Sequence, residues 1–242
     1  MLTVAVLNQK GGVGKSTLAT NLAAAAHLQQ KRVLLVDLDS QGSSFDWYAA
    51  RMEGSELAGL TVVKADRALS FTRFREIAGS YDVVVLDGPP KLGDMTRSAA
   101  VAADIVIIPV QPGPFDLWSA GETQKLLEAA DSTRADLDRG PVRRLFVVNR
   151  AHPSTNMSRS AIATLEGAGD VAKTVIHQRV VFAEAAATGE SVLTVQSSGR
   201  AADEIRRLYR EVSSAPRSVV RPLVRTTGPA TENTRRVREV SR

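Results

Sequence analysis

The residues from Lys10 to Thr17, with the sequence KGGVGKST, combine three glycines, two lysines and two hydroxyl side chains. A glycine-rich loop lets several backbone N–H groups point at one anion, and the N-terminus of a following helix adds partial positive charge. The side chain of Lys15 can then reach the terminal phosphates of a nucleoside triphosphate, and the Ser16 hydroxyl can ligate Mg²⁺. Thr17 is suited to bonding the α-phosphate or to capping the helix. The pattern predicts a phosphate-binding loop.

The strict form of this pattern, G-x-x-x-x-G-K-[ST], fails at position 9, where Gln9 replaces the first glycine. The sequence instead has an additional lysine, Lys10, five residues before Lys15. A second cation near the γ-phosphate would stabilise the negative charge of the transition state for phosphoryl transfer. The alternative for Lys10 is a solvated loop residue, and both interpretations remain open at this point.

Two segments with carboxylates follow apolar runs, namely VDLDSQG at 36–42 and VLDGPP at 85–90. Transfer of a phosphoryl group to water needs Mg²⁺ and a group that orients the water. Both should come from the carboxyl ends of parallel strands beside the phosphate loop. Asp37, Asp39 and Asp87 are therefore the acidic candidates. An Asp after a strand can also cap a helix or form a turn, which is the alternative for each.

Short apolar runs alternate with helical patterns along most of the chain. Strands are expected at 2–7, 32–36, 61–63, 82–86, 105–109 and 144–148, with a late candidate at 173–176. Helices are expected at 15–29, 69–79, 94–102, 116–131, 157–167, 182–188 and 199–213. Apolar strands separated by helices indicate an α/β fold, in which a mostly parallel, twisted sheet has helices on both faces.

The 242 residues fit one α/β domain, and the net charge of +5 is unevenly distributed. From position 215 onward the chain has seven arginines against two glutamates, while the preceding part is neutral overall. Prolines and a glycine interrupt any apolar period after Ser213. We therefore predict a phosphate-loop domain at 1–214 and a disordered basic tail at 215–242.

The composition excludes several classes of protein. There are no cysteines, so disulfides, thiolate catalysis and cysteine-ligated clusters are ruled out. The first residues lack the basic and apolar segments of an export signal, and no stretch approaches the ~18 apolar residues that span a bilayer. We expect a cytoplasmic protein.

The lysine-first loop resembles the deviant Walker A box of the ParA/MinD superfamily of ATPases, and the resemblance covers about residues 1–213. It implies Mg²⁺-dependent ATP hydrolysis and an ATP-sandwich homodimer in which Lys10 contacts the nucleotide of the partner subunit. It also implies roles for the acidic residues. Asp39 would orient or deprotonate the attacking water, Asp37 would support the magnesium shell, and Asp87 would hold Mg²⁺ through a water molecule. Ser40 departs from the proline that is common in this family.

The same resemblance assigns the nucleotide contacts. The phosphate-binding residues would be Gly11, Gly12, Val13, Gly14, Lys15, Ser16 and Thr17, with Ser16 also ligating the metal. Asn149, which with Arg150 follows an expected strand, matches the family's N-R pair and would recognise the adenine ring. Residues 110–118 (VQPGPFDLW) and 178–185 (QRVVFAEA) resemble segments of small ParA proteins of the ParF kind. We interpret Phe115 and Trp118 as packing residues at the start of a helix.

Small ParA proteins bind DNA nonspecifically as ATP-bound dimers, and a ParB-like adaptor releases them by stimulating hydrolysis. The resemblance therefore implies association with the nucleoid and segregation of plasmid or chromosomal DNA. One alternative is positioning of a protein cargo such as a carboxysome. Another is a membrane-cycling ATPase like MinD, which needs a C-terminal amphipathic helix that Pro222 would interrupt.

Candidate DNA contacts come from the last expected helix, 199–213. Its apolar stripe consists of Ala201, Ile205, Leu208 and Val212. Arg206, Arg207 and Arg210 fall outside this stripe, and Arg179 is a further candidate. The alternative is a solvated helix face on which Asp203, Glu204 and Glu211 balance the arginines.

Overall fold

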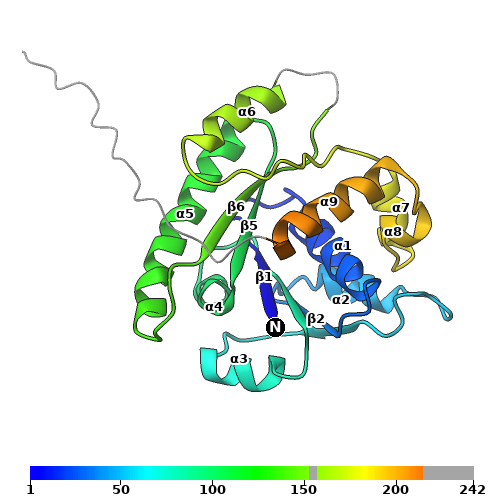
Figure 1. The fold of residues 1–242 in the computed structure, drawn as a ribbon, viewed down its shortest axis with the longest axis horizontal. Helices are drawn as coiled ribbons and strands as arrows, with labels where there is room; N and C mark the ends of the chain where they lie inside the picture. The colour runs from blue at the N-terminus through cyan, green and yellow to red at the C-terminus, as the bar shows by residue number, and fades with distance from the viewer. Residues whose placement is uncertain (153–156, 215–242) are drawn as a thin grey trace, which may run out of the picture.

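A parallel sheet forms the centre of the computed structural model, which describes residues 1–152 and 157–214 (Figure 1). Its six strands are β1 (Leu2–Val6), β2 (Val33–Asp37), β3 (Thr61–Lys64), β4 (Val83–Asp87), β5 (Ile105–Val110) and β6 (Arg143–Val148). They lie in the order β3-β2-β4-β1-β5-β6, and all neighbouring strands are parallel. The expected α/β fold class is confirmed.

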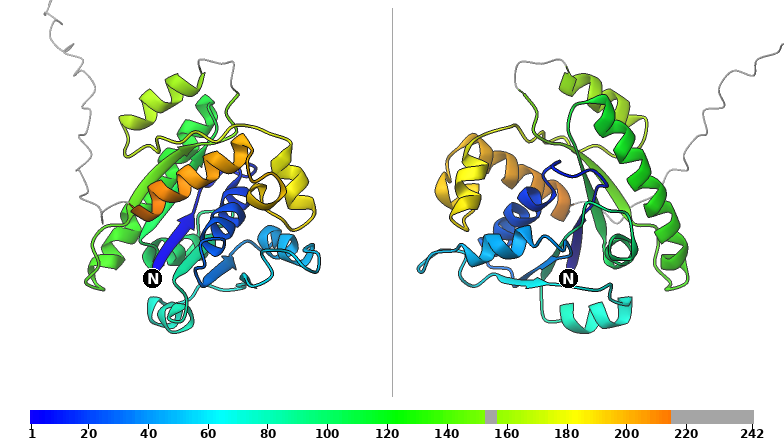
Figure 2. Two further views of the ribbon diagram at one scale, coloured as in Figure 1. Left: turned by 45° about the vertical axis from the view of Figure 1, so that its right-hand side comes forward. Right: turned by 180° about the vertical axis from the view of Figure 1, so that it is seen from behind.

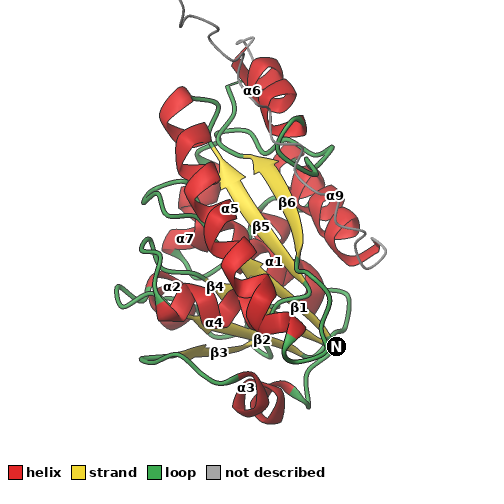
Figure 3. Ribbon diagram, turned by 90° about the vertical axis from the view of Figure 1, so that its left-hand side faces the viewer, coloured by secondary structure: helices red, strands yellow, loops and turns green. Residues whose placement is uncertain are grey.

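Helices cover both faces of the sheet. One face carries α1 (Lys15–His27), α2 (Ser43–Ala49), α7 (Val181–Ala187), α8 (Val192–Val195) and α9 (Arg200–Ser214). The other carries α3 (Phe71–Ala78), α4 (Asp94–Ala102), α5 (Pro114–Ala135) and α6 (Met157–Glu166). The views of Figure 2 show α5 and the α7–α9 group on opposite sides of the strands, and Figure 3 shows α4 and α5 in front of them.

The continuous apolar runs of the sequence are explained by burial on both faces of the sheet. All residues of β4 and β5 are buried. In β4, Val83 and Val85 pack in the cluster under α1, whereas Val84 and Leu86 pack in the cluster under α4. Such a strand needs an apolar side chain at nearly every position, which distinguishes it from the alternating pattern of a sheet with one solvated face.

The strand order places the acidic candidates at one edge of the sheet. Strand β1 lies between β4 and β5, so the chain extends the sheet in both directions from this point. Asp87, the last residue of β4, is in register with Val6 of β1 on one side and with Asp37 of β2 on the other. The crevice outside the carboxyl ends of strands at such a switch point is the usual ligand site of an open α/β sheet.

The late strand expected at 173–176 is not formed, so that prediction is wrong. The segment runs beside β6, and its last N–H donates to the carbonyl of Val148 at 2.9 Å. The N–H groups of Lys173 and Thr174, however, donate to the carboxylate of Glu211 in α9, at 2.8 and 2.9 Å. A side chain from a distant helix thus takes the hydrogen bonds that a strand partner would have accepted.

Two short helices, α2 and α8, were not expected from the sequence. The N–H groups of Ser44 and Phe45 in the first turn of α2 donate to Asp37, at 2.8 and 3.0 Å. Helix α8 begins after Ser191, which forms a capping box with Thr194. Helices of one or two turns are unstable alone, so tertiary contacts and caps decide whether they form.

Residues 153–156 and 215–242 lie outside the described residues, so the boundary at 214 and the basic tail stay predictions. The side chains of Phe115 and Trp118 also lie outside the described part, and their packing role remains a prediction. None of the helices in the described ranges combines the length and apolar character needed to cross a membrane.

Candidate nucleotide-binding site

The phosphate loop leaves β1 and turns directly into α1, as the sequence predicts. Gly12 and Gly14 have φ angles of 74° and 92°, in the left-handed region that favours glycine. A Cβ at Gly14 would also lie well inside 3.0 Å of the side-chain nitrogen of Asn149. Helix α1 begins at Lys15, and among the described residues no side chain caps the N–H groups of its first turn. The loop therefore offers free backbone donors to an anion.

Lys15 lies inside this loop and is only 7% exposed. Its Nζ donates to the carbonyl of Lys10 at 2.9 Å, which curls the side chain back over the loop. Burial lowers the pKa of Lys15, while the nearby charges of Asp87 and Asp39 raise it. The three residues predicted to act on the terminal phosphate are thus close enough to interact electrostatically.

Asp37 is fully buried and accepts hydrogen bonds from backbone N–H groups. Its Oδ1 accepts from Asp39 at 3.0 Å, and its Oδ2 accepts from Ser44 and Phe45. The helix-capping alternative therefore describes what Asp37 does in this structure. By holding the N–H of Asp39, it also fixes the start of the loop that carries the predicted water-orienting carboxylate.

Asp87 is also fully buried, and its two oxygens differ. Oδ2 accepts a hydrogen bond from the Ser44 hydroxyl at 2.6 Å, whereas Oδ1 has no hydrogen-bond partner among the described residues. Burial raises the pKa of Asp87 from 3.8 to about 7, against the opposing effects of Ser44 and Ser16. A buried carboxylate oxygen without a donor is costly, so a ligand or cation at this position would relieve the cost.

The residues present fit a magnesium ion. Ser16, in the first turn of α1, is close enough to Asp87 for its hydroxyl to lower the pKa of that carboxyl. Oδ1 of Asp87, which has no hydrogen-bond partner among the described residues, is an acceptor that a metal-bound water could use. The described residues contain no group of three His, Asp or Glu side chains that could hold a metal. The residues that would hold Mg²⁺ here are one hydroxyl and one carboxylate, with waters and substrate phosphates as the remaining ligands.

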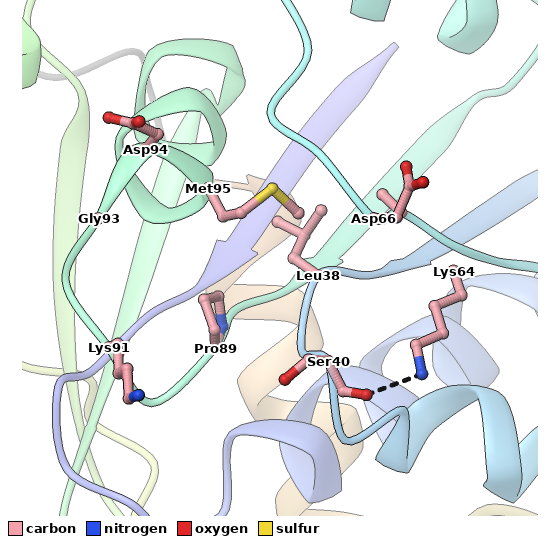
Figure 4. Close-up of a pocket in the computed structure, with 10 residues that line it drawn as sticks. Leu38, Ser40, Lys64, Asp66, Pro89, Lys91, Gly93, Asp94 and Met95 are labelled. Atoms are coloured by element: carbon pink, nitrogen blue, oxygen red, sulfur yellow. Dashed lines mark hydrogen bonds between the residues drawn. The ribbon is translucent and has the colours of Figure 1, made fainter.

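Asp39 is partly buried at the turn after β2. Its Oδ1 accepts from the N–H of Gln41 at 3.1 Å, which holds the turn in place. Lys64 crosses the same turn and donates from Nζ to the carbonyl of Ser40 at 2.9 Å (Figure 4). A hollow of about 430 Å³ lies beside it, between the loops after β2, β3 and β4, and none of the phosphate-loop residues lines it.

Lys10 makes an ion pair within its own chain. Its Nζ lies 2.9 Å from Oδ2 of Asp116, a nearly buried residue in the first turn of α5. The N–H of Lys10 donates to the side chain of Asn8, which in turn donates to the carbonyl of Pro109 at 2.7 Å. Neither Asn8 nor Asp116 was predicted from the sequence. Their only signals were a polar residue between strand and loop and an acid within the 110–118 segment.

Asn149 lies against the phosphate loop although it is more than 130 residues away in sequence. It is 3% exposed, and its Nδ2 donates to the carbonyl of Val13 at 2.7 Å. Its backbone N–H donates to Val110 at the end of β5. The structure thus brings Asn149 to the site, and its contact with adenine stays a prediction.

The candidate DNA contacts differ in their surroundings. Arg179 makes two hydrogen bonds to the buried carboxylate of Glu204, at 2.6 and 2.9 Å. Arg206 pairs with Asp203 at 3.2 Å, while Arg207 and Arg210 are exposed on α9. Arg207 and Arg210 donate to backbone carbonyls of their own helix, at 3.3 and 3.4 Å, whereas Arg179 is held by a buried carboxylate. Their contacts with DNA stay a prediction.

The acidic residues of α9 mostly serve the fold. Glu204 holds Arg179 and His177, and Glu211 accepts the two backbone N–H groups of the segment beside β6. Of the three acids expected to balance the arginines, Asp203 alone pairs with one on the exposed face in the described chain. The predicted apolar stripe of α9 is confirmed, because Ala201, Ile205, Leu208 and Val212 are all buried.

Comparison with known proteins agrees with this geometry. The family described as the CobQ/CobB/MinD/ParA nucleotide binding domain matches residues 4–192. The chain belongs to this family. One relative of this ParA/MinD-family chain is a protein of Halothiobacillus neapolitanus that is named "Maintenance of carboxysome distribution protein A". It is 35% identical over 214 residues, which cover 87% of this chain and 95% of the relative.

A second ParA/MinD relative is the chromosome-partitioning ATPase Soj of Thermus thermophilus, 34% identical over 239 residues and covering 86% and 94% of the two chains. Among solved structures, the MinD cell division protein of Aquifex aeolicus has a TM-score of 0.69 at 19% identity, covering 89% of this chain and 98% of that one. Apo McdA of Cyanothece has a TM-score of 0.71 at 19% identity, covering 88% and 99%. At this identity the two structures establish the shared fold.

Proposed function

We propose that this chain is a Mg²⁺-dependent ATPase that positions cargo on DNA. ATP would bring two copies together in a sandwich dimer, the dimer would bind DNA nonspecifically, and adaptor-stimulated hydrolysis would release it. The observation that carries the proposal is the close arrangement of the buried Lys15 and Asp87 with the partly buried Asp39 beside a lysine-first phosphate loop. Solved relatives described as a McdA–ATP complex and a MinD–Mg-ADP complex support ATP and Mg²⁺ as the ligands.

Each residue then has a role that its position allows. The loop N–H groups and Lys15 bind the β- and γ-phosphates, and Ser16 and Asp87 hold the metal. When bound, Mg²⁺ neutralises charge on the phosphate oxygens. Asp39 orients the attacking water. The hydrogen bond from the backbone N–H of Asp39 to the Asp37 carboxylate keeps Asp39 in place. Asn149 contacts the adenine ring beside the loop.

Lys10 provides the link between ATP and dimerisation. The Lys10 side chain is 39% exposed, whereas that of Asp116 is only 8% exposed. Exchange of Asp116 for a phosphate of the neighbouring subunit would therefore leave a nearly buried carboxylate unpaired, a cost that the contact with the nucleotide has to offset. Lys10→Ala should bind ATP as a monomer but fail to dimerise, whereas Lys15→Ala should lose ATP binding. Calorimetry measures the binding, and sedimentation velocity with Mg-ATP measures the dimer. A Lys10→Ala variant that dimerises like the wild type would refute the lysine-first mechanism.

There are two candidates for the cargo, because the names of the two relatives described above refer to different cargoes. Soj is named for chromosome partitioning and the Halothiobacillus relative for carboxysome distribution, at nearly equal identity. In both cases an adaptor protein, ParB-like or carried by a protein assembly, would stimulate hydrolysis on the nucleoid. DNA binding is common to both candidates, so it is the property to test first.

The DNA test compares two charge-matched variants. Arg207→Ala/Arg210→Ala removes two exposed cations of α9, and Arg73→Ala/Arg75→Ala removes two from α3 on the opposite face of the sheet. Co-sedimentation with DNA is measured with ATP, ADP and no nucleotide over a range of salt concentrations. We expect ATP-dependent, salt-sensitive binding that only the α9 variant loses. The slope of log K against log salt concentration should be about 2 to 4 units smaller for this variant, because each of the two subunits of the dimer loses two arginines. Equal binding with ATP and without nucleotide would contradict the proposed cycle.

A further inference from the structure

Ser44 is a buried residue that joins the two acidic strand ends of the site. It lies in the first turn of α2 and is 0% exposed. Its N–H donates to Oδ2 of Asp37 at 2.8 Å, and its hydroxyl donates to Oδ2 of Asp87 at 2.6 Å. Asp37 and Asp87 are register partners at the carboxyl ends of the adjacent strands β2 and β4, and Ser44 bridges their two carboxylates. No role for Ser44 was predicted from the sequence.

The hydroxyl contact decides how Asp87 presents its two oxygens. The last torsion of an aspartate side chain is broad and nearly two-fold, so burial by itself does not fix which oxygen faces a ligand. The 2.6 Å bond from Ser44 engages Oδ2 and leaves Oδ1 without a partner among the described residues. Oδ1 is therefore the oxygen of Asp87 that is left for a further partner.

The same residue connects the metal side of the site to the water side. Asp37 receives the N–H of Ser44 on Oδ2 and the N–H of Asp39 on Oδ1. A continuous hydrogen-bonded chain therefore runs from Asp87 through Ser44 and Asp37 to the backbone of Asp39. Movement of Ser44 would therefore disturb Asp87 directly and Asp39 through Asp37, and these are the two carboxylates that the proposed mechanism uses.

We propose that Ser44 is a positioning residue for magnesium binding, which turns the free oxygen of Asp87 toward the phosphate loop and ties it to the Asp39 turn. This inference rests on the proposed function, since it assumes that Asp87 holds the metal. In this proposal Ser44 acts through its bonds to Asp37 and Asp87 and is not itself a ligand of phosphate or metal. Residues of this kind, which orient a ligand without binding the metal, typically change metal affinity about 10- to 100-fold when removed.

The test measures Mg²⁺ affinity separately from nucleotide affinity. Ser44→Ala removes the hydroxyl, and Ser43→Ala makes the same change at the exposed neighbouring position of α2. Binding of a fluorescent, non-hydrolysable ATP analogue is titrated in EDTA and then at rising MgCl₂ concentrations. In Ser44→Ala we expect unchanged affinity in EDTA, but about a 10-fold higher Mg²⁺ concentration for half of the metal-induced gain. Ser43→Ala should follow the wild type in both titrations.

Three outcomes would overturn the inference. The first is a Mg²⁺ curve for Ser44→Ala that overlays the wild type. The second is an equal loss of affinity in EDTA and in Mg²⁺, which would show a general structural defect. The third is the same Mg²⁺ shift in Ser43→Ala. A wild-type protein that binds the analogue without any Mg²⁺ effect would instead refute the magnesium role within the proposed function, and the Ser44 inference with it.

Discussion

Replacing Asp87 with asparagine should stabilise the nucleotide-free protein while it weakens Mg²⁺-dependent ATP binding. Asp87 is fully buried, and one of its oxygens lacks a hydrogen-bond donor in the described structure. Burial therefore raises its pKa from 3.8 to about 7. Asn is nearly isosteric and can still accept the Ser44 hydroxyl bond, but it has no charge to bury. Asp87 would thus lower the stability of the nucleotide-free protein while it supports Mg²⁺-dependent ATP binding.

The size of the effect follows from the pKa difference, and its sign is set by proton binding. Between pH 4 and 7 the folded state holds a proton that the unfolded state has lost, so wild-type stability falls as pH rises through this window. Relative to an aspartate whose pKa stays at 3.8, the raised pKa of Asp87 lowers the free energy of unfolding by about 4 kcal/mol at pH 8 and by about 2 kcal/mol at pH 5.5. The stability advantage of Asp87→Asn should therefore be about 2 kcal/mol larger at pH 8 than at pH 5.5.

Urea unfolding of the wild type and Asp87→Asn at the two pH values provides the measurement. Comparing the change with pH removes the unknown packing difference between Asp and Asn, because that difference contributes equally at both pH values. A stability difference that is the same at pH 5.5 and pH 8 would refute the reasoning. So would an Asp87→Asn variant with normal Mg²⁺-dependent affinity for ATP, because the buried charge would then have no function to offset its cost.

Two further substitutions test the fold and the loop. Glu204→Gln should destabilise the protein by about 3 kcal/mol in urea unfolding, because Arg179 loses the buried carboxylate with which it pairs. Asp203→Asn, which breaks an exposed pair with Arg206, should cost under about 0.5 kcal/mol. Equal effects would mean that the buried pair contributes no more than a surface one. Gly14→Ala should abolish ATP binding, because the added Cβ meets the side chain of Asn149 and the left-handed φ is strained. Gly121→Ala in α5, where a Cβ meets no neighbour, should leave ATP binding unchanged, and normal titration heats for Gly14→Ala would refute the steric argument.

The sequence by itself determined the fold class and the phosphate loop. Runs such as Ile105–Val110 have apolar residues on both faces, a composition that only a strand buried on both sides requires. The loop from Lys10 to Thr17 is equally local, because its glycines, lysines and hydroxyls act within eight consecutive residues of one strand–loop–helix unit. Asp87 could be found for the same reason, since the carboxyl end of a buried strand beside such a loop is a site by topology.

Only the tertiary structure decided which side chains meet. Lys10 meets Asp116, Val13 meets Asn149, and Ser44 meets Asp87, although more than 40 residues separate the members of each pair. Local patterns do not encode such pairings, because strand order and register set them. The same holds for Glu211 of α9, whose carboxylate takes the backbone N–H groups beside β6 that a local pattern assigned to a strand. Propensity predicts an element from its own residues, whereas a hydrogen bond across the fold depends on where two elements are packed.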